Sequence, residues 1–127
     1  IIFLKPETLL PETKVDKEKI LVVLQNLIEN AIKYSKYHGK IFVSVKTEKE
    51  TVEISVKDAG IGINEDSKTK IFEKFFRTEN AQKKEAMGSG IGLYTTKDIV
   101  EKHGGKIWFE SKENEGTTFF VSLPISR

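Results

Sequence analysis

Leu24-Gln25-Asn26-Leu27-Ile28-Glu29-Asn30-Ala31-Ile32-Lys33-Tyr34 is the stretch of sequence that decides the fold. Placed on a helix at about 100° per residue, it has two working faces. One is an apolar stripe that predicts a core contact, made by Ile20, Leu24, Leu27 and Ala31. The other bears two carboxamides, an ammonium group and a phenol, contributed by Asn26, Asn30, Lys33 and Tyr34. These groups suit a magnesium ion with attached phosphates, although a solvated polar face explains this one helix equally well.

Length and composition limit the classes of protein. The chain has 127 residues, enough for one domain (1–127) with a hydrophobic core and too few for two. Its 21 basic and 19 acidic side chains give a net charge of +2, so we expect neither a nucleic-acid nor a membrane partner. The absence of cysteine excludes disulfides, thiolate metal sites and thiol nucleophiles. No apolar run approaches the roughly 20 residues that span a bilayer, and the abrupt start at Ile1 suggests a fragment of a longer protein.

Helix and strand signals follow one another along the chain. We expect a helix from the N-cap Asp16 to about Ser35, and another from the glycine cluster at 88–93 to the C-cap Gly104. Alternating apolar residues predict an antiparallel hairpin of strands 41–45 and 51–56, and two more strands over 106–110 and 117–123. Residues 1–15, with two prolines, indicate an N-terminal arm or an edge strand.

A shorter helix is expected after the N-cap Asn64. It carries four apolar side chains that we interpret as core anchors, namely Ile71, Phe72, Phe75 and Phe76. The polar run that follows, from Thr78 to Ala86, is typical of a mobile loop.

Asp58 is the first residue outside that helix to suggest chemistry. In the strand from Thr51, the even positions are apolar and predicted to be buried, and a period of two places Asp58 on the same side. A buried carboxylate needs donors from the protein or from a ligand. The glycines in Ala59-Gly60-Ile61-Gly62-Ile63 let backbone approach something flat, and an amino-bearing purine fits. An ordinary turn between a strand and a helix explains the same residues.

A second glycine cluster, Gly88-Ser89-Gly90-Ile91-Gly92-Leu93, opens a helix. Successive N–H groups and the positive end of the helix would cradle phosphate oxygens, and a flexible hinge is the alternative. The cluster does not follow a strand, which excludes a dinucleotide fingerprint, and it lacks the Gly-Lys-Ser/Thr of a Walker loop.

The order of these motifs is more informative than any one of them. The Asn-bearing helix is followed by Asp58-Ala59-Gly60-Ile61-Gly62, Phe72-Glu73-Lys74-Phe75-Phe76-Arg77, the second glycine cluster and Gly116-Thr117-Thr118-Phe119. This order closely resembles the catalytic and ATP-binding domain of sensor histidine kinases, part of the ATPase superfamily of gyrase, Hsp90 and MutL. The match runs from Asp16 to Pro124. It implies a Bergerat-type α/β (α+β) two-layer sandwich, in which three main helices cover one face of a mixed, mostly antiparallel sheet.

The resemblance also assigns roles. Asp58 would take the adenine amino group with help from Thr117 through water, and Gly60, Gly62 and Ile63 would give the base room. Thr117 is preferred over Thr118 because it shares a strand face with Phe119, Val121 and Leu123. Asn30 and Asn26 would hold Mg²⁺, and residues 78–87 would form the ATP lid. The phosphates and ribose would lie near Lys33, Tyr34, Arg77, Gly88, Ser89, Gly90, Ile91, Gly92 and Leu93.

Asn26 bears on the reaction that the resemblance implies. Hydrolytic members of the superfamily carry a water-activating Glu four residues before the metal-binding Asn, and an amide here cannot act as a base. We therefore expect transfer of the γ-phosphoryl group to an external histidine, assisted by Arg77, Lys33 and Glu29.

The acceptor histidine is expected outside this chain. His38 and His103 lie in a turn and at a helix end, and neither is followed by the Glu and Arg of a phosphoacceptor helix. The expected partners are a separate dimerisation and phosphoacceptor domain and a response regulator, in a cytoplasmic location. We expect the isolated domain to be a monomer and the whole protein a homodimer. An anti-sigma-factor-type serine kinase and an ATP-dependent interaction module remain open as alternatives.

Overall fold

The computed structural model describes residues 2–3, 17–35, 39–73 and 92–124. Along the chain these residues form β1 (Ile2–Phe3), α1 (Lys17–Tyr34), β2 (Phe42–Glu48) and β3 (Thr51–Lys57). They continue with the one-turn 3₁₀ helix η1 (Glu65–Ser67), α3 (Gly92–Lys102), β4 (Lys106–Lys112) and β5 (Gly116–Pro124). The strands make one five-stranded sheet in the order β1-β2-β3-β5-β4. Only the β1–β2 pair is parallel, so the sheet is mixed and mostly antiparallel, as expected.

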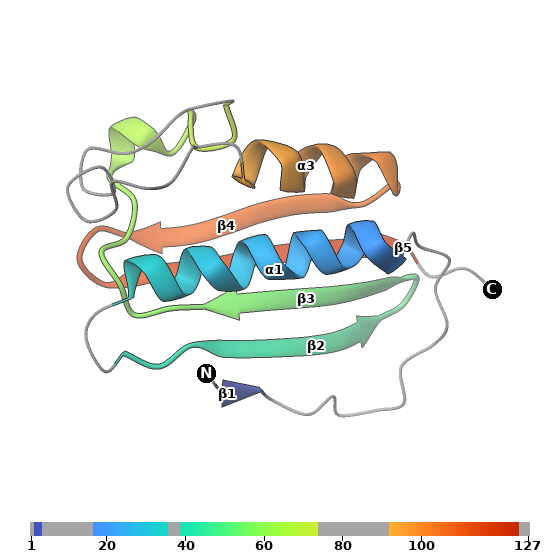
Figure 1. Cartoon of the computed structure of the whole chain (residues 1–127), viewed down its shortest axis with the longest axis horizontal. Coiled ribbons are helices and arrows are strands. Elements are labelled where there is room, and N and C mark those ends of the chain that lie inside the picture. The colour runs from blue at the N-terminus through green and yellow to red at the C-terminus, as the bar shows by residue number, and fades with distance from the viewer. Residues whose placement is uncertain (1, 4–16, 36–38, 74–91, 125–127) are drawn as a thin grey trace.

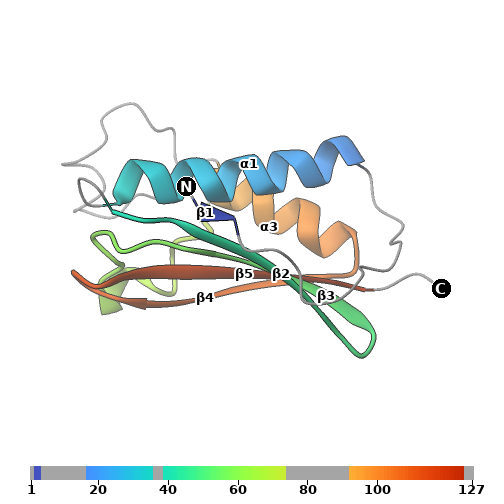
Figure 2. The ribbon, with the colours of Figure 1, turned by 90° about the horizontal axis from the view of Figure 1, so that it is seen from below.

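Helices α1 and α3 lie side by side over one face of this sheet (Figures 1 and 2). The buried face of α1 carries Val23, Leu27 and Ala31, flanked by the half-buried Ile20 and Leu24. They meet the alternate residues of β3 and β5 that point to the same side, such as Val56 and Val121. Each fully buried Val or Leu contributes roughly 1.5–3 kcal/mol, so this layer contact supplies the main driving force for the fold.

The third helix expected after Asn64 is much shorter than predicted in the part of the chain that the structure describes. Asn64 does act as a cap, because its Oδ1 accepts the Ser67 N–H at 2.9 Å, but the helix is the single turn η1. Turns follow as far as Phe72, whose ring meets those of Phe109 and Phe119 edge-on at 6.0 and 6.4 Å. Two long helices therefore cover the sheet in the described residues, instead of three; Phe75 and Phe76 lie outside those residues.

The opposite face of the sheet is left uncovered by the described helices (Figure 2). Trp108 of β4 lies on it, 37% exposed, and stacks on Phe120 of the neighbouring β5 at 5.3 Å with an interplanar angle of 10°. This places the tryptophan on the side of the sheet away from α1 and α3, as the alternation along β4 predicts. Among the described residues, no helix combines the length and the apolar character that a membrane crossing requires.

Candidate functional site

Asp58 is held with its carboxylate inside the protein at the end of β3. It follows the buried Val52, Ile54 and Val56 on the same side of the strand and is 8% exposed. Its Oδ1 accepts the N–H of Gly60 at 2.9 Å and of Thr117 at 3.3 Å. Its own N–H donates to the Thr117 carbonyl at 2.9 Å. Both bonds to the carboxylate end on Oδ1, and no donor from the described residues reaches Oδ2.

Burial raises the pKa of the Asp58 carboxyl above its ordinary value of 3.8, and the N–H groups of Gly60 and Thr117 oppose that shift without cancelling it. The raised pKa therefore reflects a cost of desolvating the carboxylate that the two N–H groups offset only in part. A perturbed acid with an unused acceptor atom is what a site for a donor-bearing ligand requires.

The glycines after Asp58 are required by contacts within the protein itself. A side chain on Gly60 would collide with the carbonyl of Tyr34, and one on Gly62 (φ +70°) with the carbonyl of Lys112. The close approach that excludes a Cβ is thus made by the protein's own backbone, and room for a base at these glycines stays a prediction. Gly60 still contributes to the site directly, because its N–H binds Asp58.

The C-terminal end of α1 is bound to the loop that follows Asp58 (residues 59–63), called the Asp58 loop below. The Ile61 N–H donates to the Tyr34 carbonyl at 3.1 Å, and Ser35 pairs with Gly60 in an isolated β-bridge. Asn30 lies one turn before Tyr34 on the same face of the helix. It is half-buried and has no hydrogen bond within the described part of the chain. Asp58 and Asn30 are therefore on the same side of the fold, with Lys33 exposed beside them.

One turn earlier, α1 is fixed to the start of α3. The Nδ2 of Asn26 donates to the Gly92 carbonyl at 3.3 Å and to the Thr96 hydroxyl at 3.2 Å. Leu93, next to Gly92, is half-buried against the core. The row Asn26, Asn30, Tyr34 on α1 thus runs from the first turn of α3 to the Asp58 loop, and Asn30 lies between the two.

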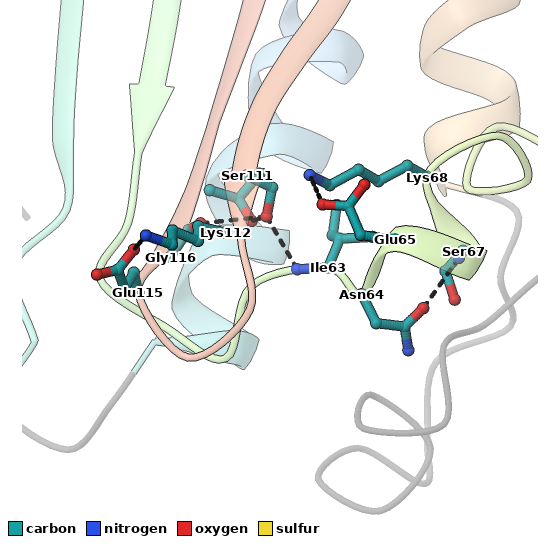
Figure 3. Close-up of polar contacts among 10 residues, drawn as sticks. Ile63, Asn64, Glu65, Ser67, Lys68, Ser111, Lys112, Glu115 and Gly116 are labelled. Carbon is teal, nitrogen blue, oxygen red and sulfur yellow. Dashed lines mark hydrogen bonds and ion pairs between the residues drawn. The ribbon is translucent and has the colours of Figure 1, made fainter.

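Ser111 belongs to the site although no motif in the sequence marks it. Its hydroxyl on β4 accepts the N–H of Ile63 at 2.8 Å and lies 2.7 Å from the Thr117 hydroxyl and 3.1 Å from the Gly116 carbonyl (Figure 3). It therefore connects the loop after Asp58 with the β4–β5 hairpin. The only signal in the sequence is its place beside Thr117 in the hairpin, and the partner Ile63 is 48 residues away.

Strand alternation correctly distinguished the two threonines. Thr117 is 6% exposed and shares the buried side of β5 with Phe119 and Val121. Thr118 points to the other face, where its strand neighbours are Lys57 and Glu110. Thr117 lies next to Asp58, because its backbone N–H donates to Asp58 Oδ1 at 3.3 Å.

Comparison with known proteins identifies the family. Residues 15–127 match the family described as histidine kinase-, DNA gyrase B- and HSP90-like ATPases. The chain belongs to this ATPase family. Within it, the catalytic domain of the histidine kinase ThkA in a nucleotide-free form superposes with a TM-score of 0.82 at 34% identity, over 98% of this chain and 79% of that one. ThkA has also been solved in complex with the response regulator protein TrrA, and that kinase chain superposes with a TM-score of 0.76 at 33% identity, over 98% of this chain and 33% of that one.

A curated member of the ATPase family, the sensor histidine kinase WalK of Bacillus subtilis (strain 168), is 43% identical over 113 residues. The match takes in 87% of this chain but 18% of WalK, so the chain spans less than a fifth of that relative. The resemblance noted from the sequence motifs is thus confirmed, as is the two-layer fold.

One described residue that the resemblance assigns to the site, Glu29, is turned away from Asn26 and Asn30. Glu29 lies on the exposed side of α1, where its Oε1 accepts the Gln25 side-chain amide at 3.0 Å. The other residues assigned to the glycine cluster, the lid and the aromatic segment lie outside the described part of the chain, so their roles stay predictions. They are Arg77, 78–87, Gly88, Ser89, Gly90 and Ile91.

Replacing Ser111 by alanine tests the connection between the loop and the hairpin. Because the Ile63 N–H would lose its acceptor in a nearly buried setting, Ser111→Ala should lower the free energy of unfolding by about 1–3 kcal/mol in urea denaturation. Ser44→Ala is the matched control, since Ser44 pairs with the Ser55 hydroxyl at 2.6 Å on the uncovered face and leaves no N–H unpaired. Equal losses in the two variants would contradict the role given to Ser111.

Proposed function

We propose that this domain binds Mg-ATP and donates the γ-phosphoryl group to a histidine on a separate phosphoacceptor domain, as the kinase module of a two-component sensor protein. The observation that carries the proposal is the buried Asp58 carboxylate with one oxygen fixed by two backbone N–H groups and the other without a donor in the described chain. That free oxygen is suited to accept the exocyclic amino group of adenine. Thr117, whose backbone N–H donates to Asp58 and whose side chain is buried on the same side of the sheet, is suited to contact the same base through water.

The amide side chains of α1 fit a magnesium ion that arrives with phosphates. Mg²⁺ prefers oxygen ligands, and Asn30 and Asn26 offer carboxamide oxygens at adjacent turns. No group of three or more His, Cys, Asp or Glu side chains in the described chain is placed to hold a metal ion. Two neutral amides would bind the ion weakly alone, so the negative phosphates of ATP would supply most of its ligands. When bound, the ion neutralises charge on the phosphates.

Transfer is favoured over hydrolysis by the chemistry of the α1 face. Asn26 is an amide and cannot take a proton from water, and the carboxylate of Glu29 is turned to the exposed side with Gln25. The residues of this chain would therefore hold and orient the nucleotide: Asp58 at the base, and Asn30, Lys33 and Arg77 at the phosphates. Residues 78–87 would act as a lid, and the nucleophile would come from the acceptor domain.

The remaining parts of the proposal concern the whole protein. We propose a cytoplasmic location, a dimer built by the acceptor domain, and a response regulator as the downstream partner. Support for the regulator comes from ThkA, a histidine kinase of the same fold that has been solved in complex with one. The isolated domain would be a monomer and would turn over little ATP.

A melting curve tests the nucleotide site. Since a ligand that binds only the native state stabilises it, Mg-ATP at 100 times its Kd should add about 2.7 kcal/mol to the free energy of unfolding and raise the Tm. GTP at the same concentration is the control, because its base carries a carbonyl where adenine has an amino group and would face the Asp58 carboxylate. An equal rise with GTP, or none with ATP, would refute the adenine site.

Radiolabelled transfer tests the reaction. The domain is mixed with the dimerisation and phosphoacceptor domain of the same protein and γ-labelled ATP. Labelled acceptor that loses its label in acid and keeps it in alkali identifies a phosphohistidine. An acid-stable label would indicate a serine kinase, and ATP-dependent association without label an interaction module; either result would refute histidine transfer.

A further inference from the structure

Thr96 is a buried hydroxyl between the two long helices that none of the sequence motifs includes. It lies on α3, is 0% exposed, and sits four residues after Gly92, whose carbonyl its hydroxyl reaches at 2.7 Å. The same hydroxyl is 3.2 Å from Nδ2 of Asn26 on α1, and that nitrogen is also 3.3 Å from the Gly92 carbonyl. Three groups from two helices thus form one closed set of hydrogen bonds.

This set determines which way the Asn26 carboxamide faces. The Gly92 carbonyl can only accept, and the single proton of the Thr96 hydroxyl is used on that carbonyl. The Gly92 carbonyl oxygen and the Thr96 hydroxyl oxygen are therefore both acceptors toward Asn26, so its side-chain NH₂ group must face them as the donor. Turning the carboxamide over would set oxygen against oxygen twice. The Oδ1 of Asn26 is left over, and no donor in the described part of the chain binds it.

We propose that Thr96 is a positioning residue for the cation that accompanies ATP. By fixing the amide nitrogen of Asn26 against α3, it keeps Oδ1 available as an oxygen ligand on the helix face that also carries Asn30. The inference rests on the proposed function, since the cation arrives with the nucleotide. Groups that orient a metal ligand typically change metal affinity or activity by 10–100-fold when removed.

The test replaces the hydroxyl and keeps the shape. In Thr96→Val the side chain no longer accepts from Asn26 or donates to Gly92. By titration calorimetry we expect its affinity for ATP in Mg²⁺ to fall roughly 10-fold, while its affinity for ATP in EDTA stays within about twofold of wild type. Thr96→Ser, which retains the hydroxyl, should bind like wild type.

Thr95→Val is the matched control. Thr95 precedes Thr96 on α3, is half-buried and makes no hydrogen bond within the described chain, so the same chemical change there should leave both affinities unaltered. Unchanged affinity of a folded Thr96→Val protein in Mg²⁺ would overturn the proposal. An equal fall in Mg²⁺ and EDTA would overturn it too, because Thr96 would then act on the nucleotide and not on the cation.

A second readout uses the wild-type protein and does not depend on the variant folding. The side-chain amide signals of Asn26 in a ¹H–¹⁵N NMR spectrum should move when Mg²⁺ is added to the ATP-bound protein, because a cation at Oδ1 withdraws electrons from the amide. No movement on addition of Mg²⁺ would refute the assignment. If the wild type bound ATP in neither buffer, the proposed function itself would be refuted. That result differs from failure of the Thr96 proposal, in which the wild type still binds ATP.

Discussion

Asp58→Asn should abolish ATP binding while leaving the protein folded. The asparagine can place its Oδ1 where the Asp58 Oδ1 accepts the N–H groups of Gly60 and Thr117, at 2.9 and 3.3 Å in the wild type. Its NH₂ group then occupies the place of the free carboxylate oxygen and faces the amino group of adenine, donor against donor. Loss of a charge-assisted bond and the unpaired donors that result weaken affinity by roughly 100-fold or more, measurable by titration calorimetry.

Measuring the free energy of unfolding at several pH values distinguishes a loss of ATP affinity in Asp58→Asn from unfolding of the variant. Because burial raises the pKa of Asp58 above 3.8, the folded protein binds a proton more readily than the unfolded chain does. The stability that Asp58 contributes is thus complete below pH 3.8 and is lost as the pH rises through the raised value. At neutral pH, Asp58→Asn should be at least as stable as the wild type, and its advantage should disappear in acid.

The control for Asp58→Asn is Asp98→Asn on α3. Asp98 is exposed, pairs with Lys102 at 3.0 Å on the helix surface, and undergoes the same chemical change. ATP affinity should remain at the wild-type value in this variant. Wild-type affinity in Asp58→Asn would show that the base lies elsewhere, and an equal loss in Asp98→Asn would remove the specificity of the result.

Gly116→Ala should cause a large loss of stability next to the site. Gly116 begins β5 with a φ of +117°, a conformation that side chains rarely adopt. A Cβ there would collide with the Asp58 carbonyl and lie 2.9 Å from the Ala59 Cα, both of them backbone atoms. Strain and collision together should lower the free energy of unfolding by about 4 kcal/mol in urea denaturation, a large share of a typical total.

Gly104→Ala separates the two causes. Gly104 also has a positive φ, +75°, but a Cβ added there meets only the Pro124 side chain, at 3.7 Å. Gly104→Ala should therefore lower the free energy of unfolding only through the unfavourable positive φ, by about 1 kcal/mol. If Gly116→Ala lost no more than Gly104→Ala, the contact between Gly116 and the Asp58 backbone would not have the importance given to it here.

The elements that were predicted well are those governed by local periodicity. The helix expected after the N-cap Asp16 and as far as about Ser35 matches α1 (Lys17–Tyr34) to within one residue, and the period of two along β3 correctly placed Asp58 on the buried side. These predictions need no knowledge of the surface against which the element packs, because the spacing of apolar residues in a half-buried helix or strand shows which of its sides is buried.

What the sequence did not reveal depends on contacts between distant segments. Asn26 and Thr96 are 70 residues apart, and Ile63 and Ser111 are 48 apart, so no spacing rule links them. The glycines illustrate the same limit: Gly62 was expected to make room for a base, but the atom that excludes its side chain is the Lys112 carbonyl of another strand. The single turn of η1 shows that a correct cap does not set the length of a helix.

The position of Trp108 determines what its fluorescence can report. It is the only tryptophan in the chain, and it stacks on Phe120 on the face of the sheet opposite the buried side chains of β5. Its emission should therefore follow loss of the sheet during denaturation, or contact of another molecule with that outer surface, and should change little when a nucleotide binds near Asp58. Trp108 is thus an intrinsic fluorescent probe for the binding of another molecule to the uncovered face of the sheet.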